Sequence, residues 1–175
     1  MKMQRLNTEL EALNSLSPEQ ANAEFLKCCG SGTWARAMNE ARPFATIAQL
    51  LVTADDVWSS LSRENWLEAF RAHPKIGEKK AAITQSEQAQ KWSAQEQAGT
   101  RKAAAETKAA LAEGNRKYLD RFGFIFIICA SGKSADEMLA SLNNRLQNDP
   151  ETELVIASAE QRKITRLRLE KLIKK

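Results

Sequence analysis

Only one segment of this chain has the composition of a β-strand, and its isolation limits the possible folds more than any other feature. Residues Phe124 to Ala130 are apolar, aromatic and β-branched, which is typical of a strand. No second segment is an obvious partner, and backbone groups of an unpaired strand would lack the hydrogen bonds of a sheet. The segment could equally be a buried extended stretch or the start of a helix.

Helix start and stop signals dominate the rest of the chain. Ser17-Pro18-Glu19-Gln20 combines an N-cap, a proline at the first helical position and a reciprocal partner at the third. Ser134 and Glu137 form a similar capping box, and Pro150 follows Asp149 at the start of the last helix. The helices expected from such signals cover Ser17 to Gly30, Thr33 to Ala41, Thr46 to Leu51, Ala54 to Leu61, Ser62 to Ala72, Ser93 to Asp120, Ser134 to Gln147, and Asp149 to near the C-terminus.

No repeat or linker divides the chain. The sequence therefore predicts one all-α domain over residues 1–175, with about eight helices and one extended apolar segment near 124–130.

Composition and length exclude several classes of protein. The chain has 175 residues, of which 43% are hydrophobic and 27% charged, as in an ordinary soluble globular protein. No apolar run approaches the roughly 20 residues that span a bilayer, and the N-terminus has no signal-peptide pattern. Three cysteines, one histidine and no Cys-x-x-Cys argue against a metal site. We expect a cytoplasmic protein with reduced thiols, no metal and no membrane association.

The net charge of +4 lies largely in the last helix. Its cations are Arg162, Lys163, Arg166, Arg168, Lys171, Lys174 and Lys175. A basic helix can contact nucleic acid, but cations near a helix C-terminus also offset the helix dipole. No nucleic-acid-binding motif accompanies the charge, so we expect no nucleic acid partner.

The single histidine, His73, lies where a helix must stop. Pro74 disfavours the α conformation of His73, and Gly77 allows a tight turn soon after it. Histidine is the only side chain whose ordinary pKa suits proton transfer near neutral pH. His73 is therefore the candidate for imidazole chemistry, or else a residue that interacts with the last carbonyls of its helix.

A second motif, Ser93-Ala94-Gln95-Glu96-Gln97, is expected to open the long helix. Ser93 and Glu96 have the spacing of a capping box. The free N–H groups of a helix N-terminus also suit an anion. The Glu96 carboxylate and the Gln97 amide could bind other polar groups of a substrate at the same place.

These motifs, taken in their order and spacing, resemble the family of 2-oxo-4-hydroxy-4-carboxy-5-ureidoimidazoline (OHCU) decarboxylases. The resemblance covers nearly the whole chain. The motifs that carry it are His73-Pro74-Lys75-Ile76-Gly77, Ser93 to Gln97, Phe122 to Ala130, and Ile164-Thr165-Arg166-Leu167-Arg168-Leu169.

The resemblance implies an all-helical, cofactor-free homodimer that converts OHCU to (S)-allantoin and CO₂ in urate breakdown. It implies that His73 is the catalytic acid/base and that Glu96 orients His73 or binds substrate. The substrate-binding positions that it implies are Pro74, Ser93, Gln97, Phe126, Ile127, Ile128, Cys129, Ala130 and Arg168. Arg166 remains an alternative to Arg168.

The residue types suit this chemistry. Loss of CO₂ leaves an electron pair on the ring carbon, which can pass to neighbouring unsaturation, so no cofactor is strictly required. Fixed donors can stabilise the resulting oxyanion, and a positioned acid can deliver a proton to one face. Two other functions stay open: a helical module that binds an acidic partner or RNA through its basic last helix, and a hydrolase that uses the same His and Glu.

Overall fold

The computed structural model of the protein describes residues 2–76, 86–100 and 103–174, and every regular element in these ranges is helical. This confirms the predicted all-α fold, with nine α-helices and one short 3₁₀ helix in the described ranges. They are α1 (Lys2–Ser15), α2 (Pro18–Cys28), α3 (Gly32–Glu40), α4 (Ile47–Ser60), α5 (Arg63–Arg71), α6 (Glu87–Glu96), η1 (Ala98–Thr100), α7 (Ala105–Phe122), α8 (Ala135–Arg145) and α9 (Pro150–Leu172). None of these helices is long and apolar enough to span a membrane.

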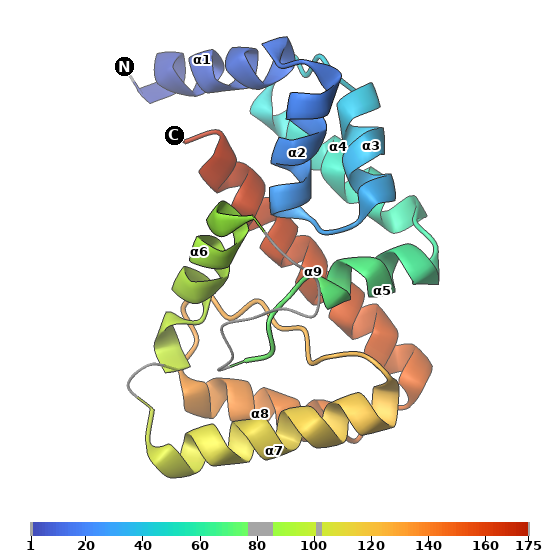
Figure 1. Ribbon diagram of the computed structural model, residues 1–175, viewed down its shortest axis with the longest axis vertical. Helices are drawn as coiled ribbons and strands as arrows, with labels where there is room; N and C mark the ends of the chain where they lie inside the picture. Colours follow the sequence, from blue (N-terminus) through green and yellow to red (C-terminus); the bar gives the residue numbers. More distant parts are fainter. Residues whose placement is uncertain (1, 77–85, 101–102, 175) are drawn as a thin grey trace. The chain divides into compact units, whose positions relative to one another are not determined.

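The chain divides into two compact units. One comprises residues 1–68 and 162–175, and the other comprises residues 69–161. Helices α5 and α9 contribute residues to both (Figure 1). The division concerns compactness alone, so a single domain over residues 1–175 stays a prediction.

The predicted helix starts at Ser17 and Ser134 are confirmed. The Ser17 hydroxyl accepts from the Gln20 N–H at 3.2 Å, and the Gln20 side chain accepts from the Ser17 N–H at 3.1 Å. Ser134 and Glu137 form the same reciprocal pair at the start of α8. These caps join residues three apart, which is why the sequence alone reveals them.

Two of the predicted helices are wrong as separate elements. Thr46 to Leu51 and Ala54 to Leu61 form one helix, α4, which begins after the N-cap Thr46. Its buried residues, Leu50, Leu51, Ala54 and Trp58, recur at helical spacing across the expected break. Burial of this continuous face outweighs the weaker helix propensity of the β-branched residues between the halves.

Helix α1 lies outside the predicted helices, and a distant arginine closes its C-terminal end. The Arg42 guanidinium donates to the carbonyls of Leu13, Asn14 and Leu16 at 2.8, 3.1 and 2.9 Å. The last carbonyls of a helix have no partner within it, so these bonds satisfy groups that would otherwise need water. The partner lies 26 to 29 residues along the chain, where no local pattern indicates it.

The adjacent cysteines lie in the core of the unit that contains α2 and α3. Neither Cys28 nor Cys29 is in a disulfide, and neither has any exposed surface. Burial raises the pKa of the Cys29 thiol to about 12, although the Ser31 N–H, the Thr165 hydroxyl and the charge of Arg168 act in the opposite direction. Such a thiol stays protonated at neutral pH and is a poor nucleophile.

In the unit of residues 69–161, α7 and α8 lie side by side (Figure 1). Gly114 permits their close approach, because a Cβ there would lie 2.5 Å from Cδ2 of Leu142. Helix α7 ends at Gly123, whose φ of 76° is left-handed.

The segment between α7 and α8 has neither helix nor strand. Its buried side chains are Phe124, Phe126, Ile127, Ile128 and Ala130. The Tyr118 ring lies 5.7 Å from the Phe124 ring and 5.3 Å from the Phe126 ring, both edge-on. Of the three alternatives, the structure therefore shows the buried non-helical stretch, and side-chain packing accounts for its apolar composition.

The predicted long helix from Ser93 to Asp120 is wrong. Helix α6 begins after the N-cap Ser86 and ends at Glu96, η1 follows, and α7 begins only at Ala105. Ser93 and Glu96 lie on the buried face of α6, together with Ala89 and Trp92. Their spacing reflects burial of one helix face rather than a cap, because both patterns place residues three apart.

Gly99 generates a stability prediction, because a Cβ there would lie 2.0 Å from the carbonyl oxygen of Lys133. A backbone atom cannot rotate away as a side chain can, so we expect Gly99→Ala to lower the free energy of unfolding by about 1–3 kcal/mol. Gly32→Ala is the matched control, since its Cβ would meet only Glu68 Oε1 at 3.6 Å. Urea unfolding of both variants checks this, and equal losses would contradict it.

Cys29 generates a prediction on alkaline stability. Its pKa in the folded protein, about 12, exceeds the ordinary value of 9.0, so the unfolded chain loses this proton first. The corresponding stability is fully present below about pH 9 and is lost as the pH rises toward 12, by at most about 1.4 kcal/mol per pH unit. Urea unfolding from pH 8 to 11 should show a shallower decline in Cys29→Ala than in the wild type. Burial also raises the pKa of Tyr118, but this residue is present in both the wild type and Cys29→Ala. Equal slopes of stability against pH in the two proteins would therefore refute the assignment to Cys29.

Candidate active site

His73 lies two residues beyond the end of α5 at Arg71, at the junction where the sequence predicts that the helix stops. The His73 N–H donates to the carbonyl of Phe70 at 3.0 Å, and the helix stops before Pro74. The imidazole is 9% exposed. Gly77, expected to form a turn, lies outside the described residues.

The imidazole of His73 contacts the side chain of Gln161 on α9. Its Nε2 lies 2.7 Å from Gln161 Oε1. This bond fixes the orientation of the ring from a residue 88 positions away. The ring therefore contacts a side chain of another helix. A histidine that only interacts with the last carbonyls of its own helix would not need this contact.

Ser93, Glu96 and Gln97 lie at the C-terminal end of α6, so the predicted anion site at a helix N-terminus is wrong. Ser93 and Glu96 are 4% and 8% exposed, and Gln97 is half-buried. The Gln97 N–H donates to the Ser93 carbonyl at 3.1 Å and closes the helix. The C-terminal end of a helix presents carbonyls rather than free N–H groups, so this end of α6 does not offer an anion the backbone donors that the sequence motif suggested.

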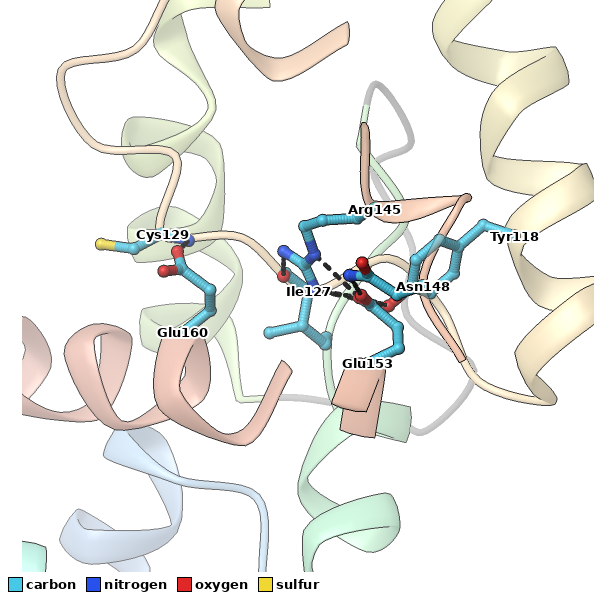
Figure 2. A network of polar contacts seen from close by, with 7 residues as sticks. All are labelled: Tyr118, Ile127, Cys129, Arg145, Asn148, Glu153 and Glu160. Carbon is cyan, nitrogen blue, oxygen red and sulfur yellow. Dashed lines mark hydrogen bonds and ion pairs between the residues drawn. The ribbon is translucent and has the colours of Figure 1, made fainter. Parts of the chain in front are cut away.

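Cys129, in the non-helical segment, contacts a carboxylate of α9. Its N–H donates to Glu160 Oε2 at 2.8 Å (Figure 2). Burial raises the pKa of the Cys129 thiol, and the charges of Glu160 and Glu96 raise it further, while the Ser131 N–H and Lys133 oppose this. The thiol is therefore unsuited to nucleophilic attack.

A buried polar cluster holds Ile127, two residues before Cys129 in the segment. Arg145, on α8, donates through Nη1 to the Ile127 carbonyl at 2.7 Å (Figure 2). The same guanidinium binds the fully buried Glu153 carboxylate, with Nε at 2.8 Å and Nη2 at 2.6 Å. Asn148 and the Tyr118 hydroxyl also donate to Glu153. The buried negative charge of Glu153 is thus compensated by the Arg145 guanidinium and by two hydrogen bonds within the same unit.

Arg168 and Arg166 belong to the other unit, and their surroundings differ. Arg168 is 2% exposed, and its Nη1 lies 3.5 Å from the Lys27 carbonyl oxygen. Arg166 is half-exposed and lies 3.6 Å from Asp55 and 3.9 Å from Glu170. Every other predicted site residue lies within the unit of residues 69–161, so both arginines stay predictions.

The local sequence motifs do not single out four residues that the structure places here, namely Gln161, Glu160, Arg145 and Glu153. One signal could have found two of them, because Glu153 and Gln161 occupy buried positions of α9 in register with Leu154, Ala157 and Ile164. A polar residue within an apolar helical stripe needs a specific partner. Within the described ranges, no group of three His, Cys, Asp or Glu side chains could hold a metal ion.

Comparison with known proteins identifies the family. The family model described as OHCU decarboxylase matches residues 14–170. A 2-oxo-4-hydroxy-4-carboxy-5-ureidoimidazoline decarboxylase of Amia calva is 32% identical over 173 residues, which cover 94% of each chain. A uric acid degradation bifunctional protein of Arabidopsis thaliana is 40% identical over 158 residues, which are 90% of this chain but 48% of that protein.

A solved structure agrees with these relatives. The crystal structure of an OHCU decarboxylase in the presence of (S)-allantoin superposes with a TM-score of 0.75 at 41% identity, covering 87% of this chain and 99% of that one. A family match over most of the chain, joined to this likeness in sequence and structure, shows that the chain belongs to the OHCU decarboxylase family and is a carboxy-lyase.

Proposed function

We propose that this protein decarboxylates OHCU to (S)-allantoin and CO₂ in urate breakdown, without a cofactor and with His73 as general acid/base. The observation that carries the proposal is a buried imidazole held by Gln161 in a chain of this family. The names of the relatives support the substrate, and the crystal structure with (S)-allantoin supports the product.

The reaction needs a proton at one face of the ring carbon. The C–C bond to the carboxylate breaks, CO₂ leaves, and the electron pair remains on the ring carbon until a proton reaches it. An acid that cannot rotate delivers this proton to one face only, which yields one enantiomer. The Gln161 contact supplies such a restraint on His73.

Polar side chains at the end of α6 complete the proposed site. Glu96 can accept from the ureido N–H groups or orient His73, and Gln97 can both donate and accept. Ser93, Pro74 and the backbone of residues 126–130 are the other proposed substrate contacts in this unit, and Arg168 is the proposed partner of a carboxylate.

The expectation of a homodimer rests on the family resemblance, whereas the expected location and the absence of membrane and nucleic acid partners rest on the sequence composition and motifs. We propose a cytoplasmic homodimer that binds neither nucleic acid nor membrane. The competing role of α9 as a basic binding helix has less support, because Arg166 lies near Asp55 and Glu170, and Lys174 near Glu170, so part of the charge is neutralised.

His73→Ala should abolish stereospecific turnover. OHCU generated from urate with uricase and hydroxyisourate hydrolase should yield (S)-allantoin rapidly with the wild type, followed by circular dichroism. We expect the variant to be slower by about 10²–10⁴-fold, the usual contribution of a positioned acid/base. Unchanged far-ultraviolet dichroism would show that the fold survives. A variant that still forms (S)-allantoin at the wild-type rate would exclude His73 from proton transfer.

Gln161→Leu should lower kcat while leaving KM nearly unchanged, because Gln161 contacts His73 rather than the substrate. We expect a loss of about tenfold, the kinetic equivalent of one hydrogen bond of about 1.4 kcal/mol. Gln161→Glu keeps an acceptor of the same reach and should retain more activity than Gln161→Leu. Equal activity of the two variants would argue against the positioning role.

A further inference from the structure

We propose that Arg145, held by Glu153, is a positioning residue that directs the N–H of Ile128 toward the substrate. The inference rests on the proposed function, since it concerns the backbone of the segment expected to contact OHCU. It assigns a role in catalysis to a buried ion pair that lies in the core of the unit.

The carbonyl of Ile127 has a strong and fixed partner. Arg145 Nη1 donates to it at 2.7 Å, and the guanidinium carbon lies 4.6 Å from the centre of the Phe126 ring (Figure 2). The Arg145 side chain is 9% exposed, so little water competes for these contacts. A charged donor in such surroundings holds a carbonyl more tightly than a neutral one.

The guanidinium is itself immobilised. Its Nε and Nη2 bind the Glu153 carboxylate, which also accepts from Tyr118 and from Asn148 Nδ2 at 2.8 Å. A buried ion pair stabilises a fold little more than a well-packed apolar pair of similar volume. The stability of the fold therefore does not by itself account for this cluster. Its other effect is to hold the Ile127 carbonyl, which lies in a segment without regular structure.

Peptide geometry transmits this restraint to Ile128. The only cis peptide bond among the described residues joins Arg42 and Pro43, so the bond between Ile127 and Ile128 is trans. In a trans peptide unit the carbonyl and the N–H point in opposite directions. With the Ile127 carbonyl bound to Arg145, the N–H of Ile128 must point away from the guanidinium.

The N–H of Ile128 is a donor without an acceptor among the described residues. Ile128 is 6% exposed, and a buried amide usually has an acceptor, which this one does not find within residues 2–76, 86–100 and 103–174. The next amide along, that of Cys129, is taken by Glu160. The N–H of Ile128 is therefore available to a ligand, and it lies in the segment that the family resemblance assigns to substrate binding.

The chemistry of the ligand follows from this donor. An N–H whose peptide carbonyl is bound to a cation is polarised and donates more strongly. It suits an acceptor that gains negative charge, such as the oxyanion that forms as CO₂ leaves an ureidoimidazoline ring. Fixing its direction before the reaction begins makes that stabilisation available at once.

The test replaces both charges together, because removing one would leave the other buried and unpaired. In the double variant Arg145→Met, Glu153→Gln, the amide of residue 153 can still bond Tyr118 and Asn148. We expect kcat to fall about tenfold or more while the protein stays folded, with a smaller enantiomeric excess of (S)-allantoin.

The matched control is Arg116→Met, Glu113→Gln, an Arg–Glu pair of the same unit whose guanidinium and carboxylate lie 2.7 Å apart at the surface. This double variant should keep wild-type kcat, KM and enantiomeric excess. A wild-type kcat and enantiomeric excess in the Arg145 variant would overturn the inference. If the wild type itself shows no decarboxylation, the proposed function fails instead.

A measurement on the wild type keeps the inference testable should the Arg145 variant not fold. Titration with (S)-allantoin should shift the ¹H–¹⁵N resonance of the Ile128 amide and slow its hydrogen exchange. The amide of Cys129, already bound to Glu160, is the internal reference and should shift less. An Ile128 resonance that does not respond to saturating (S)-allantoin would overturn the inference.

Discussion

The buried carboxylate of Glu153 is the interaction that fixes the conformation of the non-helical segment in the unit of residues 69–161. A charge removed from water is tolerated only when it is paired and hydrogen-bonded. The groups that satisfy it come from different elements: Tyr118 from α7, Arg145 from α8 and Asn148 from the turn before α9. Arg145 retains a donor for Ile127. One carboxylate thus ties three helices to the non-helical segment, and the segment acquires a defined conformation without belonging to a sheet.

Helix α9 combines structural and functional positions on a single buried face. Its stripe contains apolar residues such as Leu154 and Ala157, but it also contains Glu153, Gln161 and Arg168. Glu153 organises the Arg145 cluster, and Gln161 holds His73. The rigid helix fixes the distance between Glu153 and Gln161. The imidazole and the backbone of residues 127–129 are therefore both oriented by side chains of α9.

A serine followed by a glutamate three residues later can have a local or a tertiary cause, and this explains why one predicted helix start is confirmed and another is wrong. Ser134 and Glu137 form the capping box that their spacing indicates. Ser93 and Glu96 have the same spacing but lie on the buried face of α6, whose cap is Ser86. A pattern of residues three apart cannot distinguish a cap from one face of a helix, because both place the side chains on the same side. Only the burial of Trp92 and its neighbours decides between the two.

The sequence by itself determined the helical fold, the end of α5 before Pro74 and the family, because these depend on residues adjacent in the chain or on motifs read in order. It also singled out His73, since no other imidazole exists in the chain. Only the tertiary structure decided that Gln161 holds His73, that Glu160 accepts from the Cys129 N–H and that Arg145 holds Ile127. The first and last of these contacts join residues 88 and 18 positions apart. Their partners are chosen by how buried polar groups satisfy one another after the helices pack, which no local pattern encodes.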